Sequence, residues 1–112
     1  MRIAIPVSEG KLAMHFGHCE RFALIDVDPE SPQTMSKKEL EAPEHAPGVF
    51  PRWLADQGTN VVIAGGMGAS ARNLLARSGI TVLTVVSPQP PEALVAAYME
   101  GTLATGNHVC DH

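Results

Sequence analysis

Apolar and polar residues alternate along the first third of the chain, and a period of two is typical of strands. The predicted strands are residues 3–7, 22–27 and 35–41, separated by turn-forming residues at 8–10 and 28–32. The third strand alternates weakly and carries several charges, which suits the edge of a sheet. Short connections between successive strands favour antiparallel pairing in this part of the chain.

The second half of the chain has helical spacing instead. Three apolar stripes indicate helices: Phe50, Trp53, Leu54 and Gln57; Ala71, Leu74, Leu75 and Ser78; and Leu94, Ala97 and Tyr98. Gly58, Gly79 and Gly101 follow these stripes and are typical helix stops. Continuous apolar runs at residues 61–64 and 80–86 predict buried parallel strands between the helices. The pattern as a whole predicts an α/β domain with a mixed sheet.

The length of 112 residues predicts a single domain, 1–112, in which residues 102–112 form a flexible polar tail. Hydrophobic residues make up 45% of the chain and charged residues 18%, as in globular proteins. A formal net charge of −4 argues against nucleic-acid binding. No apolar run has membrane-spanning length, and the N-terminus lacks the pattern of a signal peptide, so we expect a cytoplasmic protein without a membrane partner.

Histidine and cysteine gather in two short windows. The candidate metal ligands are His15, His18 and Cys19 in the first window, and His108, Cys110 and His112 in the second. Imidazole and thiolate suit zinc, copper, iron and iron–sulfur species. In an extended tail the three residues of the second window would project to one side. The alternatives are a solvated surface loop and a frayed tail whose side chains bind nothing.

A glycine-rich turn follows the strand at residues 61–64 and precedes a helix. It consists of Gly65, Gly66, Met67 and Gly68. Free N–H groups at a helix N-terminus attract anions, and glycine lets an anion approach closely. The turn fits the relaxed dinucleotide fingerprint, but the acidic residue expected after the next strand is missing. The alternative is a tight turn packed on the sheet; in either case we expect Gly66 or Gly68 to occupy a position that a Cβ would disturb.

Catalysis has weak support in the sequence. Cys110 has histidines nearby, but a mobile tail does not fix a nucleophile and a base in one geometry. The first strand carries no carboxylates of the kind a metal-dependent nuclease needs. We therefore expect that this protein is not an enzyme.

Three motifs together resemble the dinitrogenase iron–molybdenum cofactor biosynthesis family. They are the N-terminal IAIPVSEG, the His15-Phe16-Gly17-His18-Cys19 loop followed by Arg21-Phe22, and the glycine turn with Gly79-Ile80 beyond it. The resemblance covers nearly the whole chain. It implies a ribonuclease-H-like three-layer fold with a five-stranded mixed sheet and about three helices. Its implied cofactor-binding residues are His15, Phe16, Gly17, His18, Gly65, Gly66, Met67 and Gly68.

The resemblance also implies a function. We expect a binding or carrier protein for a molybdenum–iron or molybdenum–copper sulfide cluster, or its precursor, that works with a cluster donor, a cluster acceptor or an ATPase. The alternative is a metal- or redox-responsive interaction module that binds one zinc or copper ion through the His-x-Cys-x-His tail, a feature the resemblance does not cover.

Overall fold

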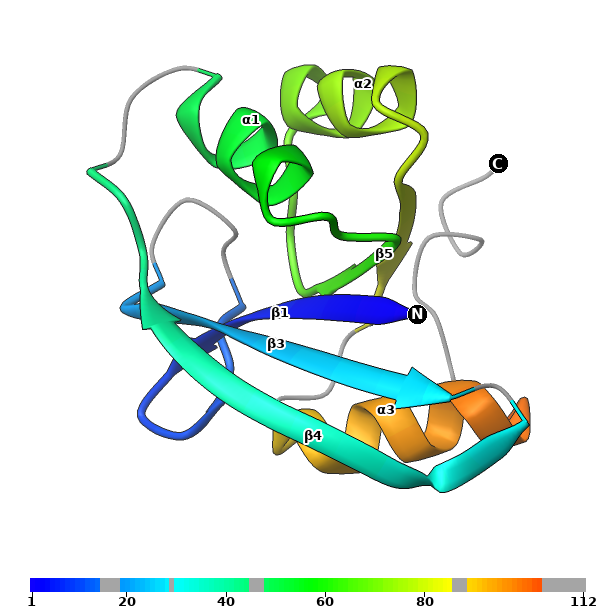
Figure 1. Cartoon of the computed structure of the whole chain (residues 1–112). Coiled ribbons are helices and arrows are strands. Elements are labelled where there is room, and N and C mark those ends of the chain that lie inside the picture. The colour runs from blue at the N-terminus through cyan, green and yellow to red at the C-terminus, as the bar shows by residue number, and fades with distance from the viewer. Residues whose placement is uncertain (15–18, 29, 45–47, 86–88, 104–112) are drawn as a thin grey trace.

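A mixed sheet with helices on both faces forms the centre of the molecule (Figure 1). The computed structural model describes residues 1–14, 19–28, 30–44, 48–85 and 89–103, without the side chains of residues 32–34. The strands are β1 (Arg2–Ser8), β2 (Lys11–Leu12), β3 (Arg21–Asp28), β4 (Ser31–Glu41), β5 (Val61–Ala64) and β6 (Thr81–Thr84). The helices are α1 (Val49–Asp56), α2 (Ala69–Arg77) and α3 (Pro91–Glu100).

The strand order is β4-β3-β1-β5-β6, and β2 pairs with β1 beside this main path. The pairs β1–β3 and β3–β4 are antiparallel, whereas β1–β5 and β5–β6 are parallel. The five-stranded mixed sheet and its change from antiparallel to parallel pairing confirm the sequence prediction. The change follows from the connections: only a few residues separate β1 from β2 and β3 from β4, whereas α1 and α2 precede the parallel strands β5 and β6.

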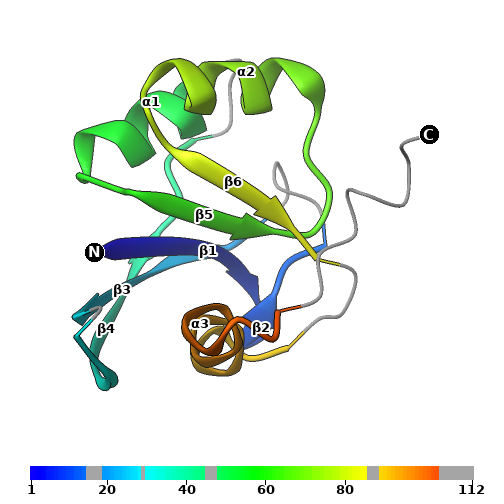
Figure 2. The ribbon, with the colours of Figure 1, turned by 90° about the vertical axis from the view of Figure 1, so that its right-hand side faces the viewer.

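The helices divide between the two faces of the sheet, α1 and α2 on one and α3 on the other (Figures 1 and 2). Each face has its own apolar core. Phe50 and Leu54 of α1 and Leu75 of α2 pack with Phe22 and Leu24 of β3. Alternate strand residues meet Leu94 and Val95 of α3 on the opposite face. The observed helices follow the predicted stripes, and none in the described part of the chain is long and apolar enough to cross a bilayer.

Three details differ from the sequence prediction. The two-residue β2 was not expected, because so short a segment has no readable period. β4 begins at Ser31 and takes in Pro32, where a turn was expected. An edge strand tolerates proline because its missing N–H removes no hydrogen bond when it faces away from the sheet. Leu103, in the predicted tail, packs against the α3-side core, while residues 104–112 lie outside the described residues.

A polar cluster at the start of β1 ties together three elements. The Arg2 guanidinium donates through Nε and Nη2 to the two carboxylate oxygens of Asp26, at 2.8 and 3.1 Å. Its Nη1 donates to the Gln57 carbonyl oxygen at 2.6 Å, and the Arg2 backbone N–H donates to the Asn60 side chain at 2.7 Å. Arg2 thus holds β3 and the end of α1 to the amino end of β1, at the edge of the sheet opposite the carboxyl ends of the parallel strands.

Candidate functional site

The carboxyl ends of β1, β5 and β6 lie at one edge of the sheet, because the three strands are parallel neighbours. Open α/β sheets bind ligands outside this edge. The segment after β2 and the glycine turn (residues 65–68) both leave the sheet here. Leu12 N–H donates to the Gln89 carbonyl at 3.0 Å, so the segment before α3 joins the same edge.

The glycine turn packs against Met14, the residue that precedes the first histidine window. Gly66 N–H donates to the Met14 carbonyl oxygen across 2.6 Å. A Cβ on Gly65 would lie 2.7 Å from the Met14 Cα and 2.8 Å from its carbonyl oxygen. Neither distance leaves room for a carbon atom. Gly65 is therefore required so that two backbone segments can pack, and the contact brings Met14, the last described residue before the histidine window, to the turn.

Gly68 occupies a different environment. It caps α2 with an extended backbone, φ −71° and ψ 160°, and a Cβ built there meets no atom of the described residues within 4 Å. The expectation that a Cβ would disturb Gly66 or Gly68 is therefore wrong for Gly68 and stays a prediction for Gly66, while the structure shows crowding at Gly65. Open space at a helix start is itself informative, since it leaves room for a group to approach the backbone.

The first turn of α2 supplies no negative charge to compensate the helix dipole. It contains no acidic residue, and no side chain caps the helix. The first helical bond runs from Arg72 N–H to the Gly68 carbonyl at 3.1 Å, so the N–H groups before Arg72 have no acceptor within the helix. Together with the helix dipole, these donors make the end of α2 attractive to an anion.

Cys19 forms the other stem of the histidine loop. It is half-buried and packs against the α1–α2-side core, which Met67 also contacts. Burial raises the pKa of the Cys19 thiol to about 11, so the thiol is protonated at neutral pH. The next residue, Glu20, donates its N–H to the Val7 carbonyl at 3.0 Å. Both stems of the loop are thus fixed at the carboxyl edge of the sheet.

The sequence-predicted site residues fall into two groups. Cys19, Gly65, Gly66, Met67 and Gly68 are described and lie at this edge. The others lie outside the described residues: His15, Phe16, Gly17 and His18 in the loop, and His108, Cys110 and His112 in the tail. No three His, Cys, Asp or Glu side chains form a metal-binding group within the part of the chain that the structure describes.

Sequence reasoning missed Met14. Its backbone holds the glycine turn, and its side chain is 38% exposed although it is large and apolar. A thioether is a soft ligand that suits copper(I) and sulfide-bound metals. No periodicity marks Met14, but its place directly before the histidine window could have drawn attention to it.

Residues 1–101 match the family model described as dinitrogenase iron–molybdenum cofactor. The chain belongs to this family. The dinitrogenase iron–molybdenum cofactor family model therefore spans β1 through the end of α3, including the glycine turn and the histidine loop. It stops before the His-x-Cys-x-His tail.

Relatives of known sequence or structure match this chain over most of its length. The uncharacterized protein MJ0580 of Methanocaldococcus jannaschii is 28% identical over 108 residues, which cover 92% of this chain and 89% of that protein. The crystal structure of PH0822 matches with a TM-score of 0.84 at 25% identity and covers 100% of both chains. The apo form of the orange protein from Desulfovibrio gigas matches with a TM-score of 0.74 at 23% identity, over 94% of this chain and 92% of that one. The latter match concerns the fold alone.

Proposed function

We propose that this protein binds and carries a metal–sulfur cluster, or its precursor, at the carboxyl edge of the sheet. The observation that carries the proposal is the contact of the glycine turn with Met14, at which Gly66 N–H bonds to the Met14 carbonyl and Gly65 leaves no room for a side chain. Because Met14 directly precedes the histidine window in the sequence, this contact supports a site that combines the anion-attracting start of α2 with imidazole ligands. Membership of the dinitrogenase iron–molybdenum cofactor family supports the same cargo.

The two sides of the site contribute different chemistry. Sulfide-bridged molybdenum species are anions, and the uncapped N-terminus of α2 favours negative charge. The open space beside Gly68 lets such a species approach the backbone N–H groups. His15 and His18 are the proposed metal ligands. Cys19 is a weaker ligand while its thiol remains protonated, because the thiolate is the binding form.

The proposed role is that of a carrier and not of an enzyme. Hydrogen bonds from backbone donors and coordination by a few imidazoles can hold a preformed cluster without any catalysed reaction. Neutral imidazole is the ligand form, so uptake should fall as the pH drops through the histidine range, about 6.5 for an unperturbed side chain. The tail residues His108, Cys110 and His112 stay a predicted additional ligand set.

A charge placed at Gly68 tests the electrostatic half of the proposal. Aspartate is a good N-cap, so Gly68→Asp should leave the free energy of unfolding unchanged or raise it by a few tenths of a kcal/mol, on the order expected for a Gly-to-Asp cap. The same carboxylate should repel an anionic cluster and lower its uptake about tenfold or more. Gly68→Asn is the matched control, because it has the same shape and capping ability without the charge. Equal cluster uptake by the Asp and Asn variants would contradict an anionic cargo at α2.

Ligand variants test the other half. A double substitution of His15 and His18 with Ala should abolish cluster retention on gel filtration while the protein stays folded. Truncation after Gly106 removes His108, Cys110 and His112 together and should lower metal affinity or stoichiometry. Retention by the double variant together with loss in the truncated chain would move the site to the tail and favour a single zinc or copper ion there.

A further inference from the structure

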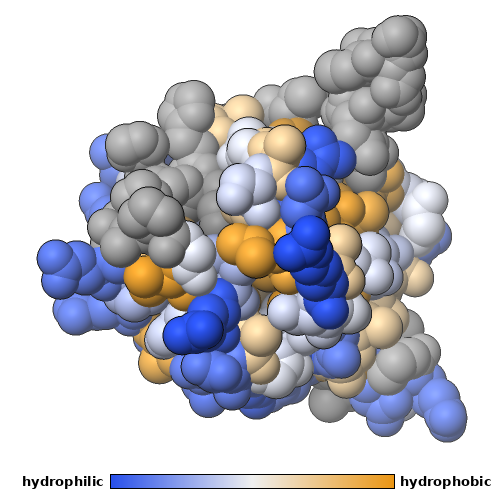
Figure 3. All heavy atoms as spheres, turned by 90° about the horizontal axis from the view of Figure 1, so that it is seen from above, coloured by the Kyte–Doolittle hydropathy of each residue, from blue (hydrophilic) through white to orange (hydrophobic). Residues whose placement is uncertain are grey.

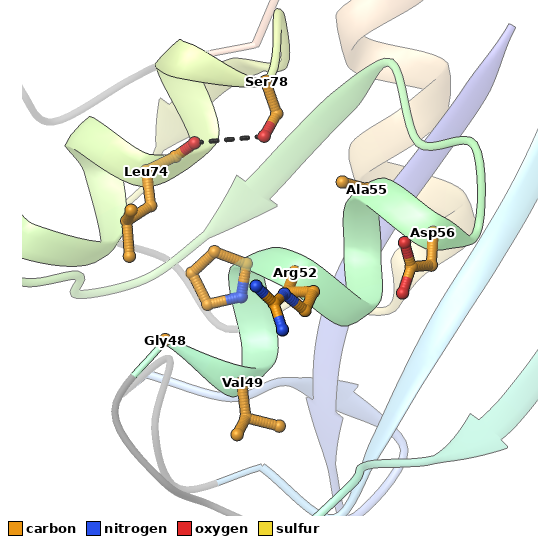
Figure 4. Close-up of a pocket in the computed structure, with 8 residues that line it drawn as sticks. Gly48, Val49, Arg52, Ala55, Asp56, Leu74 and Ser78 are labelled. Carbon is orange, nitrogen blue, oxygen red and sulfur yellow. Dashed lines mark hydrogen bonds between the residues drawn. The ribbon is translucent and has the colours of Figure 1, made fainter.

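A groove separates α1 from α2 on the outer side of the helical layer (Figure 4). Its volume is about 460 Å³, and its lining combines apolar and polar side chains. The apolar part consists of Val49, Pro51, Ala55 and Leu74. Leu74 and Val49 are only partly buried, so the groove presents apolar surface to solvent. Seen from above, the molecule shows apolar patches among strongly hydrophilic side chains (Figure 3).

The helical layer is basic in an acidic protein. Between residues 49 and 77 the charged residues are Arg52, Arg72 and Arg77 against Asp56 alone, whereas the chain has a formal net charge of −4. None of the three arginines forms an ion pair with any residue that the structure describes. All three are exposed, so their guanidinium groups are available to a partner.

One arginine lines the groove, and a second lies next to a lining residue in the sequence of α2. Arg52 lines it from α1, one helical turn before Asp56 (Figure 4). Arg77 lies three residues after Leu74 on α2, and residues three apart are neighbours on a helix surface. Arg72 is two residues from Leu74 and therefore points away from the groove. The lining thus contains the guanidinium of Arg52 and the carboxylate of Asp56, and Arg77 directly precedes Ser78, which lines the groove from the end of α2.

The start of α1 adds to the positive potential. Gly48 caps α1 with a left-handed backbone and no side-chain hydrogen bond, and the first turn contains no acidic residue. The positive end of the helix dipole is therefore not compensated at Gly48 and Val49, both of which line the groove. A helix start alone does not define a site, but here it adds to the positive potential of the arginines.

We propose that the α1–α2 groove is the docking surface for an acidic protein segment with an apolar anchor, supplied by the protein that delivers the cargo or receives it. The anchor packs against Leu74, Val49 and Pro51, and the flanking carboxylates pair with Arg52 and Arg77. The inference rests on the proposed carrier function in one respect: a carrier must bind the proteins that deliver or receive its cargo. α2 connects the two sites, since it begins at the glycine turn and borders the groove along its later part.

Binding of synthetic peptides to the full-length, cluster-free protein tests the proposal. Two peptides share their length and their leucine positions, and carry either glutamate or lysine at every polar position. We expect the glutamate peptide to shift amide resonances of α1 and α2 in two-dimensional NMR spectra, with an affinity that falls as salt is added. The lysine peptide should not bind. Arg52→Glu and Arg77→Glu should each weaken binding about 3- to 10-fold, as expected for charge reversal at the edge of an interface.

Arg72→Glu is the matched control, because it makes the same charge change on the same helix away from the groove. It should alter the affinity by less than about twofold. The dispersion of the NMR spectrum shows whether each variant is folded. The proposal is overturned by absence of shifts on α1 and α2, by equal binding of the two peptides, or by an equal effect of Arg72→Glu. Tighter binding of a single-stranded oligonucleotide to the same face would assign it to nucleic acid and overturn the proposal as well.

The peptide experiment uses no metal, so its outcome is independent of cluster uptake. Peptide binding without cluster uptake would remove the proposed function and leave the docking surface, whereas the reverse result would remove the docking surface alone.

Discussion

Gly65 and Gly68 stand three residues apart in one turn, and the structure predicts opposite responses to the same methyl group. Gly65→Ala drives a Cβ to within 2.7 to 2.9 Å of three Met14 backbone atoms. Backbone atoms cannot rotate aside as a flexible side chain can, so the two segments must separate. Gly68→Ala places its methyl group where no atom of the described part of the chain lies within 4 Å.

The magnitudes follow from the contacts. Inserting a methyl group into a packed position costs about 1–3 kcal/mol. Separating the segments also weakens the Gly66–Met14 hydrogen bond, worth about 0.5–1.5 kcal/mol. Replacement of glycine by alanine restricts the unfolded chain and returns about 0.4–1 kcal/mol at either site. At Gly68 this gain roughly cancels the loss of a better N-cap residue. We expect Gly65→Ala to destabilise the protein by about 1–3 kcal/mol relative to Gly68→Ala.

Urea unfolding followed by tryptophan fluorescence measures this difference. Trp53 is the only tryptophan and lies half-buried with its ring 5.3 Å from that of Phe22, so its emission reports on the α1–α2-side core. With a slope of roughly 1–3 kcal/mol per molar urea, the two midpoints should differ by on the order of 1 M. Equal midpoints would refute the claim that the turn and the Met14 segment are packed together, and with it the geometry of the proposed site.

Two further predictions concern single polar groups. Thr59 is buried, and its hydroxyl has no hydrogen-bond partner among the described residues. Thr59→Val should therefore raise the free energy of unfolding by about 1 kcal/mol, whereas Thr59→Ser should not. A destabilised Val variant would reveal a partner for the hydroxyl. The hydrogen bond from Arg2 lowers the pKa of Asp26, so the ionised carboxylate stabilises the fold above its unfolded pKa of about 3.9, and that stability is lost as the pH falls through the lower folded value. Asp26→Asn should therefore lower the free energy of unfolding by about 0.2–1 kcal/mol at pH 7, a small effect because the ion pair is partly exposed to solvent. Below the folded pKa of Asp26 the substitution should have almost no effect. An equal loss of stability at both pH values would contradict the ionic contribution.

The sequence was informative wherever structure follows a local period. The alternation at residues 3–7 and 22–27 and the stripes through Leu54, Leu75 and Leu94 predicted the strands, the helices and the change to parallel pairing. Glycines after the helices marked their ends for the same reason, since a left-handed backbone at Gly58, Gly79 and Gly101 is a local property. Short elements such as β2 have too few residues to show a period.

The site was predictable only as a set of residue types. Histidine and cysteine in short windows, and glycine before a helix, indicate ligand chemistry wherever they fold. The contact between Gly66 and Met14 joins segments far apart in the chain, and no pattern within either segment encodes it. For the same reason the sequence did not indicate Gly65, where the approach of Met14 leaves no room for a side chain. Burial of Cys19, and hence its raised pKa, also depends on packing against the distant α1–α2-side core.

The central claim is that this protein holds a metal–sulfur cluster, and its absorption spectrum after reconstitution tests that claim most directly. The protein is incubated without oxygen with molybdate and sulfide, together with iron or copper, and is then separated from free reagents by gel filtration. The proposal predicts charge-transfer bands in the visible range that elute with the protein, with metal and sulfide in a fixed ratio to the chain. A colourless protein fraction, whether free of metal or loaded with a single zinc or copper(I) ion, would contradict it.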